Sequence, residues 1–212
     1  MSSLADRGRP FLTFYDDATG ERTELSYATF DNWVAKTSNF LVDALDVTPD
    51  DEVGVEMPDH WQKVVIPFAA WRVGAGSAIR RADLTFVAED RLSGFDRTGV
   101  REVVGVSLRP LAPPLSRAWP GVADYADVAA YADTFPGGRE PRAPLVRYAK
   151  DLAAALGWDA RSRIQVLPDA DVVVVALAAA QVGAGIVIFA TPPADLAQVV
   201  RSERITDVVG RT

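Results

Sequence analysis

Two stretches of the chain resemble each other and decide its fold: MPDHWQKVVIPFAAWRVGAGSAI at 57–79 and LPDADVVVVALAAAQVGAGIVI at 167–188. Each has Pro-Asp near its start and Val-Gly-Ala-Gly near its end, with an apolar run of helical length between them. The separation is 16 residues from Pro58 to Gly74 and 15 residues from Pro168 to Gly183. We interpret the two stretches as copies of one strand–helix–strand unit.

Weaker features of the two copies extend this interpretation. VVG occurs at 103–105 and again at 208–210, so we expect each copy to close with an equivalent strand. The glycines of Val-Gly-Ala-Gly follow a helix, whereas a dinucleotide-binding fingerprint places its glycines after a strand and before a helix. We therefore expect Gly74 and Gly183 to end their helices with positive φ angles, and dinucleotide binding is the alternative.

Short strands and helices alternate along the rest of the chain. FLTFY at 11–15 and the residues at 23–25 predict a strand hairpin, and Ser26 is a suitable N-cap for a helix whose apolar residues run to Leu45. Further strands are expected at 51–57, 76–79, 84–87, 102–106 and 163–167, and further helices at 58–73 and 145–156. The alternation predicts parallel sheets covered by helices.

The expected organisation has three parts. Residues 1–108 contain the hairpin, the long helix and the first βαβ unit; residues 109–144 form a Pro-rich connector with a short helix near 125–131; residues 145–212 contain the second βαβ unit. The fold class is therefore α/β, with two related, flavodoxin-like strand–helix–strand units in parallel-rich sheets, and an N-terminal strand hairpin.

Composition excludes some classes of partner. The net charge is −7 without long blocks of one sign, so we expect no nucleic-acid partner, because phosphate contacts require clustered Lys and Arg. No apolar run approaches the roughly 18 residues that cross a bilayer, so we expect no membrane partner. The N-terminus lacks the apolar core of a signal peptide, and the chain has no cysteine. These features lead us to expect a cytoplasmic protein.

Isolated reactive side chains have ordinary structural interpretations. His60 is the only histidine, and no Gly-x-Ser-x-Gly motif or ligand cluster accompanies it, so we expect a surface or capping role rather than catalysis or metal binding. The carboxylates at 16–17 and 50–52 lie in predicted turns, where solvated residues are a simpler account than a catalytic pair. Trp61 and Trp71 are expected in the core, with a pocket lining as the alternative.

The chain resembles the N-terminal half of acyl-CoA synthetases, which belong to the AMP-binding, adenylate-forming superfamily. The resemblance depends on Ser26-Tyr27, Asp51-Glu52-Val53, Pro58-Asp59 and Gly74-Ala75-Gly76, and RSERITDVVG at 201–210 is similar to a later family segment. Family members have two related sheet-and-helix subdomains, which would account for the internal repeat. The chain most resembles short actinobacterial proteins of this group, which implies a truncated relative.

The resemblance also identifies where an ATP site would be. In the family, a Thr/Ser/Gly-rich loop ending in Pro-Lys-Gly wraps the ATP phosphates between the two copies. The corresponding interval here offers Gly137, Gly138, Arg139 and Arg142 as candidate cofactor-binding residues, but it has no lysine and no run of Ser or Thr. A solvated Pro/Gly loop is the interpretation we favour. The chain also ends before the family's catalytic lysine, so we expect no catalytic residue, cofactor or metal.

These observations predict a non-catalytic, AMP-binding-enzyme-like protein that acts in binding or assembly. A homodimer or a protein partner is expected, because sheets without their family neighbours would leave apolar surface, chiefly at 172–175 and 187–189. A small-molecule sensor of a nucleotide or an acyl-CoA is one alternative. An enzyme of another class with an unrecognised site is the other.

Overall fold

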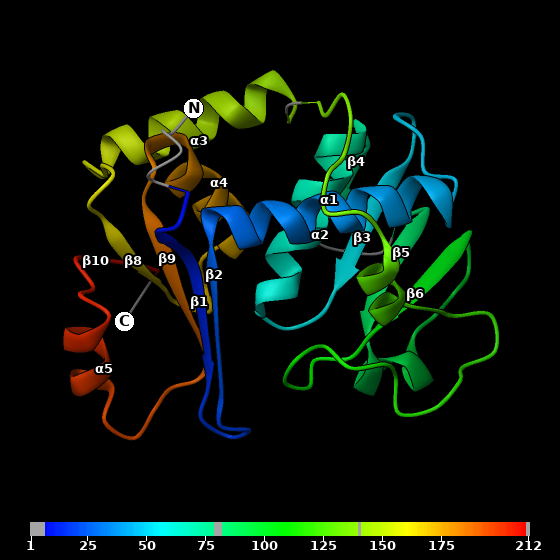
Figure 1. The fold of residues 1–212 in the computed structure, drawn as a ribbon, viewed down its shortest axis with the longest axis horizontal. Coiled ribbons are helices and arrows are strands. Elements are labelled where there is room, and N and C mark those ends of the chain that lie inside the picture. Colours follow the sequence, from blue (N-terminus) through cyan, green and yellow to red (C-terminus); the bar gives the residue numbers. More distant parts are fainter. Residues whose placement is uncertain (1–6, 79–81, 140, 211–212) are drawn as a thin grey trace. The chain divides into compact units, whose positions relative to one another are not determined.

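The computed structural model describes residues 7–78, 82–139 and 141–210, and it divides the chain into two units (Figure 1). The first unit contains the described residues up to Phe30, Asp59–Val64 and those from Arg142 onward. The second contains Asp31–Pro58 and the described residues from Val65 to Pro141. The helices α1 (Tyr27–Asp43) and α2 (Trp61–Val73) begin in the first unit and continue in the second.

The sheet of the first unit has the strand order β10-β8-β9-β1-β2. Its strands are β1 (Pro10–Asp16), β2 (Glu21–Ser26), β8 (Arg163–Val166), β9 (Gly185–Thr191) and β10 (Asp207–Val209). Strands β1 and β2 are antiparallel and form the predicted hairpin, and the other neighbours are parallel. Ser26 Oγ accepts a hydrogen bond from the Thr29 amide at 3.1 Å, which confirms the predicted N-cap of α1.

Three helices accompany this sheet: α3 (Ala143–Ala155), α4 (Val172–Val182) and α5 (Leu196–Ser202). Helix α4 packs against β9, and α3 packs against α4. Helix α5 has no buried residue. It precedes β10, and Glu203 follows it directly.

The apolar segments that we expected to be poorly covered are buried within the chain, so this expectation was wrong. Val172 and Val175 are 1% and 3% exposed, and Val187 and Phe189 are 0% and 6% exposed. The physical reason is local: β9 lies between β8 and β1, α4 packs against β9 and α3, and the Tyr15 ring stacks on Phe189 with 5.3 Å between ring centroids. The first unit thus covers this apolar surface with its own side chains.

The sheet of the second unit is parallel throughout and has the order β4-β3-β5-β6-β7. Its strands are β3 (Glu52–Glu56), β4 (Gly76–Ala78), β5 (Leu84–Ala88), β6 (Glu102–Val106) and β7 (Ala123–Asp124). The 3-10 helices η2 (Glu89–Gly94) and η3 (Tyr125–Ala130) follow β5 and β7. The expected strand at 76–79 is confirmed as far as Ala78, and Ile79 lies outside the described residues.

Part of the Pro-rich stretch at 109–144 belongs to the core of the second unit. Strand β7 pairs with β6, which the sequence did not predict, and η3 confirms the short helix expected near 125–131. Tyr125 is 1% exposed, and its hydroxyl lies 2.8 Å from Thr37 Oγ1 in α1. Its ring meets Phe86 edge to face at 5.5 Å between centroids, so η3 fixes the stretch to the sheet.

The internal repeat is confirmed in backbone conformation and in strand order. Gly74 has φ +101° and Gly183 has φ +76°, as expected of residues that end helices. Strand β3 lies between β4 and β5, just as β8 lies between β9 and β10. The expected equivalence of the two strands that contain VVG was wrong, however. Strand β10, with residues 208–209, occupies the position of β5, whereas residues 103–105 lie in β6. Three strands and one long helix therefore repeat.

Candidate functional site

The candidate cofactor-binding residues lie in two different units. Gly137, Gly138 and Arg139 lie near the end of the second unit, beside α2: the Arg139 amide donates to the Arg72 carbonyl oxygen at 2.9 Å. A Cβ on Gly138 would lie 2.8 Å from Cγ of Arg72, so this glycine permits close packing. Arg142 is exposed and precedes α3 in the first unit. Their possible role toward a nucleotide stays a prediction.

His60 is buried, so the expected surface position was wrong, whereas the capping role is present. It is 3% exposed, and its Nδ1 accepts a hydrogen bond from the Gln62 amide at 3.3 Å in the first turn of α2. Its ring packs on Phe14, and its Nε2 lies 3.9 Å from Oε2 of Glu21. Burial lowers the pKa of His60, although Glu21 opposes this shift. His60 is therefore a core residue of the first unit.

The two predicted turn clusters of carboxylates differ. Asp16 holds the hairpin turn, because its carboxylate accepts from the Ala18 amide and from the Thr19 hydroxyl. Asp51 is 7% exposed, so its expected solvated position was wrong. It accepts from the Arg101 guanidinium at 2.5 Å and from the Thr48 amide at 2.7 Å, and these contacts lower its pKa. Both carboxylates are occupied by structural contacts.

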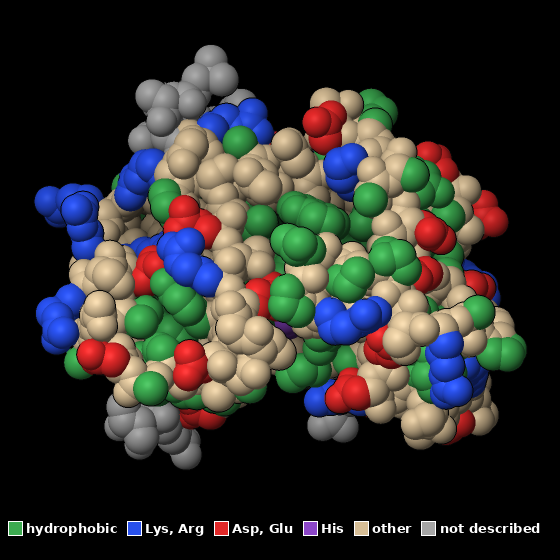
Figure 2. Space-filling view, turned by 60° about the horizontal axis from the view of Figure 1, so that its bottom comes forward, with side chains coloured by type: hydrophobic (Ala, Val, Ile, Leu, Met, Phe, Trp, Pro, Cys, Tyr) green, Lys and Arg blue, Asp and Glu red, His purple; other side chains and the backbone are tan. Residues whose placement is uncertain are grey.

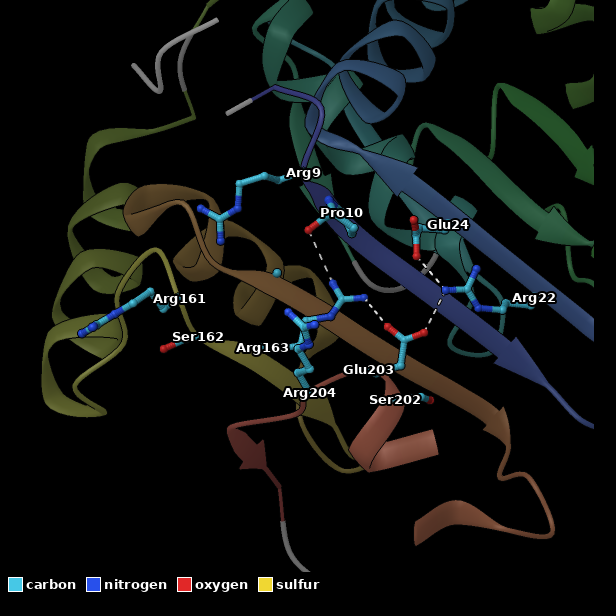
Figure 3. Close-up of a pocket in the computed structure, with 11 residues that line it drawn as sticks. Arg9, Pro10, Arg22, Glu24, Arg161, Ser162, Arg163, Ser202, Glu203 and Arg204 are labelled. Atoms are coloured by element: carbon cyan, nitrogen blue, oxygen red, sulfur yellow. Dashed lines mark hydrogen bonds and ion pairs between the residues drawn. The ribbon is translucent and has the colours of Figure 1, made fainter. Parts of the chain in front are cut away.

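A cavity of about 460 Å³ in the first unit has the chemistry of a binding site (Figure 3). We call it the arginine pocket, because five of its lining residues are arginines and two are glutamates. The lining consists of Arg9, Pro10, Arg22, Glu24, Arg161, Ser162, Arg163, Gly185, Ser202, Glu203 and Arg204. A pocket of this size accommodates a small organic molecule.

The arginine pocket lies at the amino ends of three parallel strands. Pro10, Arg163 and Gly185 are the first residues of β1, β8 and β9. Ligands of doubly wound sheets usually bind at the opposite, carboxyl ends of the strands. The pocket therefore lies at the opposite ends of the strands from the ligand sites that are common in this fold class.

The Glu203 carboxylate is the centre of a charged network in the pocket. Oε1 accepts from the Tyr15 hydroxyl at 2.5 Å and from Arg22 at 2.8 Å, and Oε2 accepts from Arg163 at 2.7 Å. Burial alone would raise the pKa of Glu203, but the hydrogen bonds from Tyr15, Arg163 and Arg22 outweigh it and lower the pKa to about 2. Glu203 is therefore ionised at neutral pH and joins the end of α5 to β1, β2 and β8.

The remaining arginines of the pocket are not paired with its glutamates. Arg9 donates to the Ala160 carbonyl oxygen, and Arg161 pairs with Asp159 at 2.8 Å, outside the lining. In the part of the chain that the structure describes, the Arg204 guanidinium has no hydrogen bond or ion pair. The pocket therefore has a surplus of positive charge.

On the face in Figure 2, both Lys or Arg and Asp or Glu side chains are distributed over the surface of the described residues. Within the described ranges, no group of three or more potential ligands could hold a metal ion. No described helix is both long and apolar enough to cross a membrane.

Sequence reasoning did not identify the arginine pocket. Its arginines come from four separate segments, around 9, 22, 161–163 and 204, and none of these forms a recognisable motif. Only the order β8-β9-β1-β2 brings them together. The available signal was indirect: the first strand of the second copy begins with a charged residue, Arg163, although the strand lies inside a sheet.

A sequence relative places the chain in a family. A protein of Mycobacterium tuberculosis (strain ATCC 25618 / H37Rv), described as a TIGR03089 family protein, is 35% identical over 227 residues. The match covers 97% of this chain and 93% of the relative. The chain belongs to this family. The model of the AMP-binding enzyme family also matches residues 4–101, so this TIGR03089 family chain is a relative of the AMP-binding superfamily.

Solved structures show the same fold for the TIGR03089 family chain. An acyl-CoA synthetase from Brucella canis matches with a TM-score of 0.78 at 17% identity, over 97% of this chain and 45% of that one. Acetoacetyl-CoA synthetase from Streptomyces lividans matches with a TM-score of 0.72 at 18% identity, over 97% and 40%. The chain thus spans less than half the length of these two structures, and the likeness concerns the fold alone.

Proposed function

We propose that the protein binds a small anionic molecule in the arginine pocket and does not adenylate carboxylic acids. The observation that carries this proposal is the ratio of charges in the pocket, where five arginines meet two glutamates. The whole chain has the opposite balance, with a net charge of −7. A local excess of cations in an acidic protein is the electrostatic complement of an anion.

The chemistry of the guanidinium group supports an anionic ligand. Its planar set of donors matches carboxylate and phosphate oxygens in pairs, and it remains charged at every physiological pH. Like charges held around one cavity repel each other, and a bound anion would relieve this repulsion. Arg9 and Arg204 supply the charges that no carboxylate of the described residues neutralises, and Arg161 is paired with Asp159 outside the lining.

Calorimetric titration with inorganic phosphate, pyrophosphate and citrate tests this function. We expect all three anions to bind, more weakly as salt rises, because salt screens exposed charges. The double variant Arg161→Gln/Arg204→Gln should weaken binding at least ~10-fold, since it removes two charges. Arg201→Gln is the matched control, because Arg201 is exposed on α5 outside the lining. Failure of every anion to bind, or equal losses in both variants, would exclude the pocket as the site.

The same titration separates the pocket from a retained nucleotide site. ATP, AMP, CoA and acyl-CoAs belong in the panel, because the resemblance to AMP-binding enzymes suggested them. Binding of AMP that survives Arg161→Gln/Arg204→Gln would favour a site elsewhere, such as the segment at 137–142. Binding that is lost in this variant would assign the nucleotide to the arginine pocket.

Assembly is a second proposal, and a specific observation favours it. Strand β10 ends the sheet of the first unit, and its Val208 is 52% exposed. An apolar side chain on an edge strand favours pairing with another strand. We therefore propose that the chain associates with itself or with a protein partner.

A further inference from the structure

The arginine pocket has two chemically different ends (Figure 3). We call Arg9, Arg161, Ser162 and Arg204 the cationic end, and Arg22, Glu24, Arg163 and Glu203 the paired end. At the paired end each charge has an opposite neighbour: Arg163 and Arg22 contact Glu203, and Arg22 contacts Glu24 at 2.7 Å. The charge surplus of the pocket is therefore concentrated at the cationic end.

The cationic end offers mainly hydrogen-bond donors. Ser162 Oγ accepts from the Asp159 amide at 3.2 Å, which leaves its hydroxyl proton available to a ligand. The Arg161 side chain is 90% exposed and pairs with Asp159 at 2.8 Å. Arg9 and Arg204 have no carboxylate partner among the described residues, so with the Ser162 hydroxyl this end suits a group that has only acceptors and more than one negative charge. A phosphate monoester has both properties.

The volume of the pocket leaves room for a ligand larger than inorganic phosphate. One water molecule occupies about 30 Å³ in the liquid, so a cavity of about 460 Å³ has room for many more atoms than a phosphate group contains. Only Pro10 offers an apolar side chain among the lining residues. The remainder of the ligand is therefore polar rather than a hydrocarbon.

Glu24 supplies an acceptor at the paired end. Its Oε2 accepts from Arg22, and its Oε1 accepts no hydrogen bond from any described residue. The side chain is 36% exposed. A ligand hydroxyl can donate to this free oxygen, whereas the Glu203 oxygens already accept from Tyr15, Arg22 and Arg163.

We infer that the arginine pocket takes a phosphate monoester of a polyhydroxylated molecule, with the phosphate at the cationic end and a hydroxyl group at Glu24. This ligand class rests on the proposed anion-binding function and makes it more specific. The cationic end provides affinity for the phosphate, and Glu24 selects ligands that can donate a hydrogen bond. A ligand without a hydroxyl group would leave the partly buried Glu24 acceptor unpaired, which costs binding free energy.

Calorimetry with three probes tests the inference: ribose 5-phosphate, n-butyl phosphate and inorganic phosphate. We expect ribose 5-phosphate to bind at least ~10-fold more tightly than n-butyl phosphate, which is about the effect of one hydrogen bond to a charged group. In Glu24→Ala, which removes the acceptor, this preference should disappear, whereas Glu24→Gln keeps an acceptor oxygen and should retain part of it. Glu52→Gln, which removes an exposed glutamate of the second unit, should change neither affinity.

The outcomes separate this inference from the function on which it rests. Equal affinity for ribose 5-phosphate and n-butyl phosphate would overturn the ligand class and leave anion binding intact. An equal loss for both probes in Glu24→Ala would overturn the selective role of Glu24. No binding of any of the three probes would overturn anion binding itself. An unchanged thermal unfolding midpoint of each variant confirms that the fold is retained in these comparisons.

Discussion

Gly185 lies beneath the guanidinium of Arg163, and its missing side chain gives the guanidinium room to cross β9. A Cβ on Gly185 would lie 2.6 Å from Nη1 of Arg163 and 2.8 Å from the Pro10 carbonyl oxygen. Nη2 of the same side chain donates to Thr13 Oγ1 at 2.6 Å and to Glu203 at 2.7 Å. The second glycine of Val-Gly-Ala-Gly thus lets one cation reach from β8 to β1 and hold the pocket together.

Replacing Gly185 tests this role. Gly185→Ala should displace Arg163, weaken anion binding and lower the free energy of unfolding by about 1–3 kcal/mol, the usual cost of overpacking. Urea unfolding and phosphate titration measure the two effects. Gly8→Ala is a suitable control, because nothing lies within 4 Å of a Cβ there. A fully stable Gly185→Ala with unchanged binding would contradict the steric role.

Glu203 should stabilise the first unit in a pH-dependent way. Glu203→Gln should lower the free energy of unfolding by about 2 kcal/mol at neutral pH, because hydrogen bonds to a charged group are lost. Glu24→Gln is the control: its pair with Arg22 is exposed, so the loss should be below about 1 kcal/mol. Urea midpoints of the two variants measure the difference.

The sign of the pH dependence follows from the lowered pKa of Glu203. The carboxyl has a pKa of about 2 in the folded chain and 4.5 ordinarily, so its contribution is complete above 4.5. It is lost as the pH falls from 4.5 through about 2, because the unfolded chain takes up the proton first. The stability difference between the wild-type protein and Glu203→Gln should therefore narrow in this range. A difference that stays constant down to pH 2 would contradict the network.

His60 should make the protein less stable in mild acid. Burial lowers its pKa from the ordinary 6.5, so the unfolded chain takes up a proton below this pH before the folded chain does. Between about pH 7.5 and about pH 5.5 the wild type should lose up to about 1 kcal/mol relative to His60→Asn. Because His60 is the only histidine, proton NMR of its ring measures the pKa directly. A ring pKa at or above 6.5 would refute the prediction.

The protein should not adenylate carboxylic acids. The interval expected to bind the ATP phosphates has no lysine, and its Gly138 and Arg139 pack on Arg72. Removing a positioned donor to a transferring group typically costs about 3 kcal/mol in the transition state. Exchange of labelled pyrophosphate into ATP, with a broad panel of acids, measures the activity. Carboxylate-dependent exchange above a heat-inactivated sample would contradict this expectation.

Self-association should involve the edge of the first sheet. We expect a dimer at micromolar concentration and a shift to monomer in Val208→Lys, because a charge on an edge strand opposes strand pairing. Val42→Lys, at an exposed position of α1 in the second unit, is the control. Light scattering after size exclusion gives both masses. A monomeric wild type would argue against self-association and leave a different protein partner as the remaining form of the proposal.

The periodicity of the sequence predicts most of this fold, but it does not predict the site. Apolar patterns and paired glycines locate the repeated unit, because local sequence determines helices, their ends and buried strands. The sequence did not predict strand β7, because it has only two residues and so shows no alternation of apolar and polar side chains. The environment of His60 and the arginine pocket depend on which distant strands become neighbours. A single sequence does not specify the order of the strands in the sheet. The ion pair between Glu203 and Arg163 could therefore not be predicted from it.

The repeated unit also provides an internal comparison within the molecule. Glu52 pairs with Gly76 at the start of β3, and Arg163 pairs with Gly185 at the start of β8, so the two charged residues occupy the same place in the repeat. Their charges are opposite. The same position of the repeated unit therefore holds an exposed carboxylate in one copy and, in the other, the guanidinium that anchors Glu203 in the arginine pocket. The two copies keep the same backbone while the side chain at the start of the first strand differs in charge.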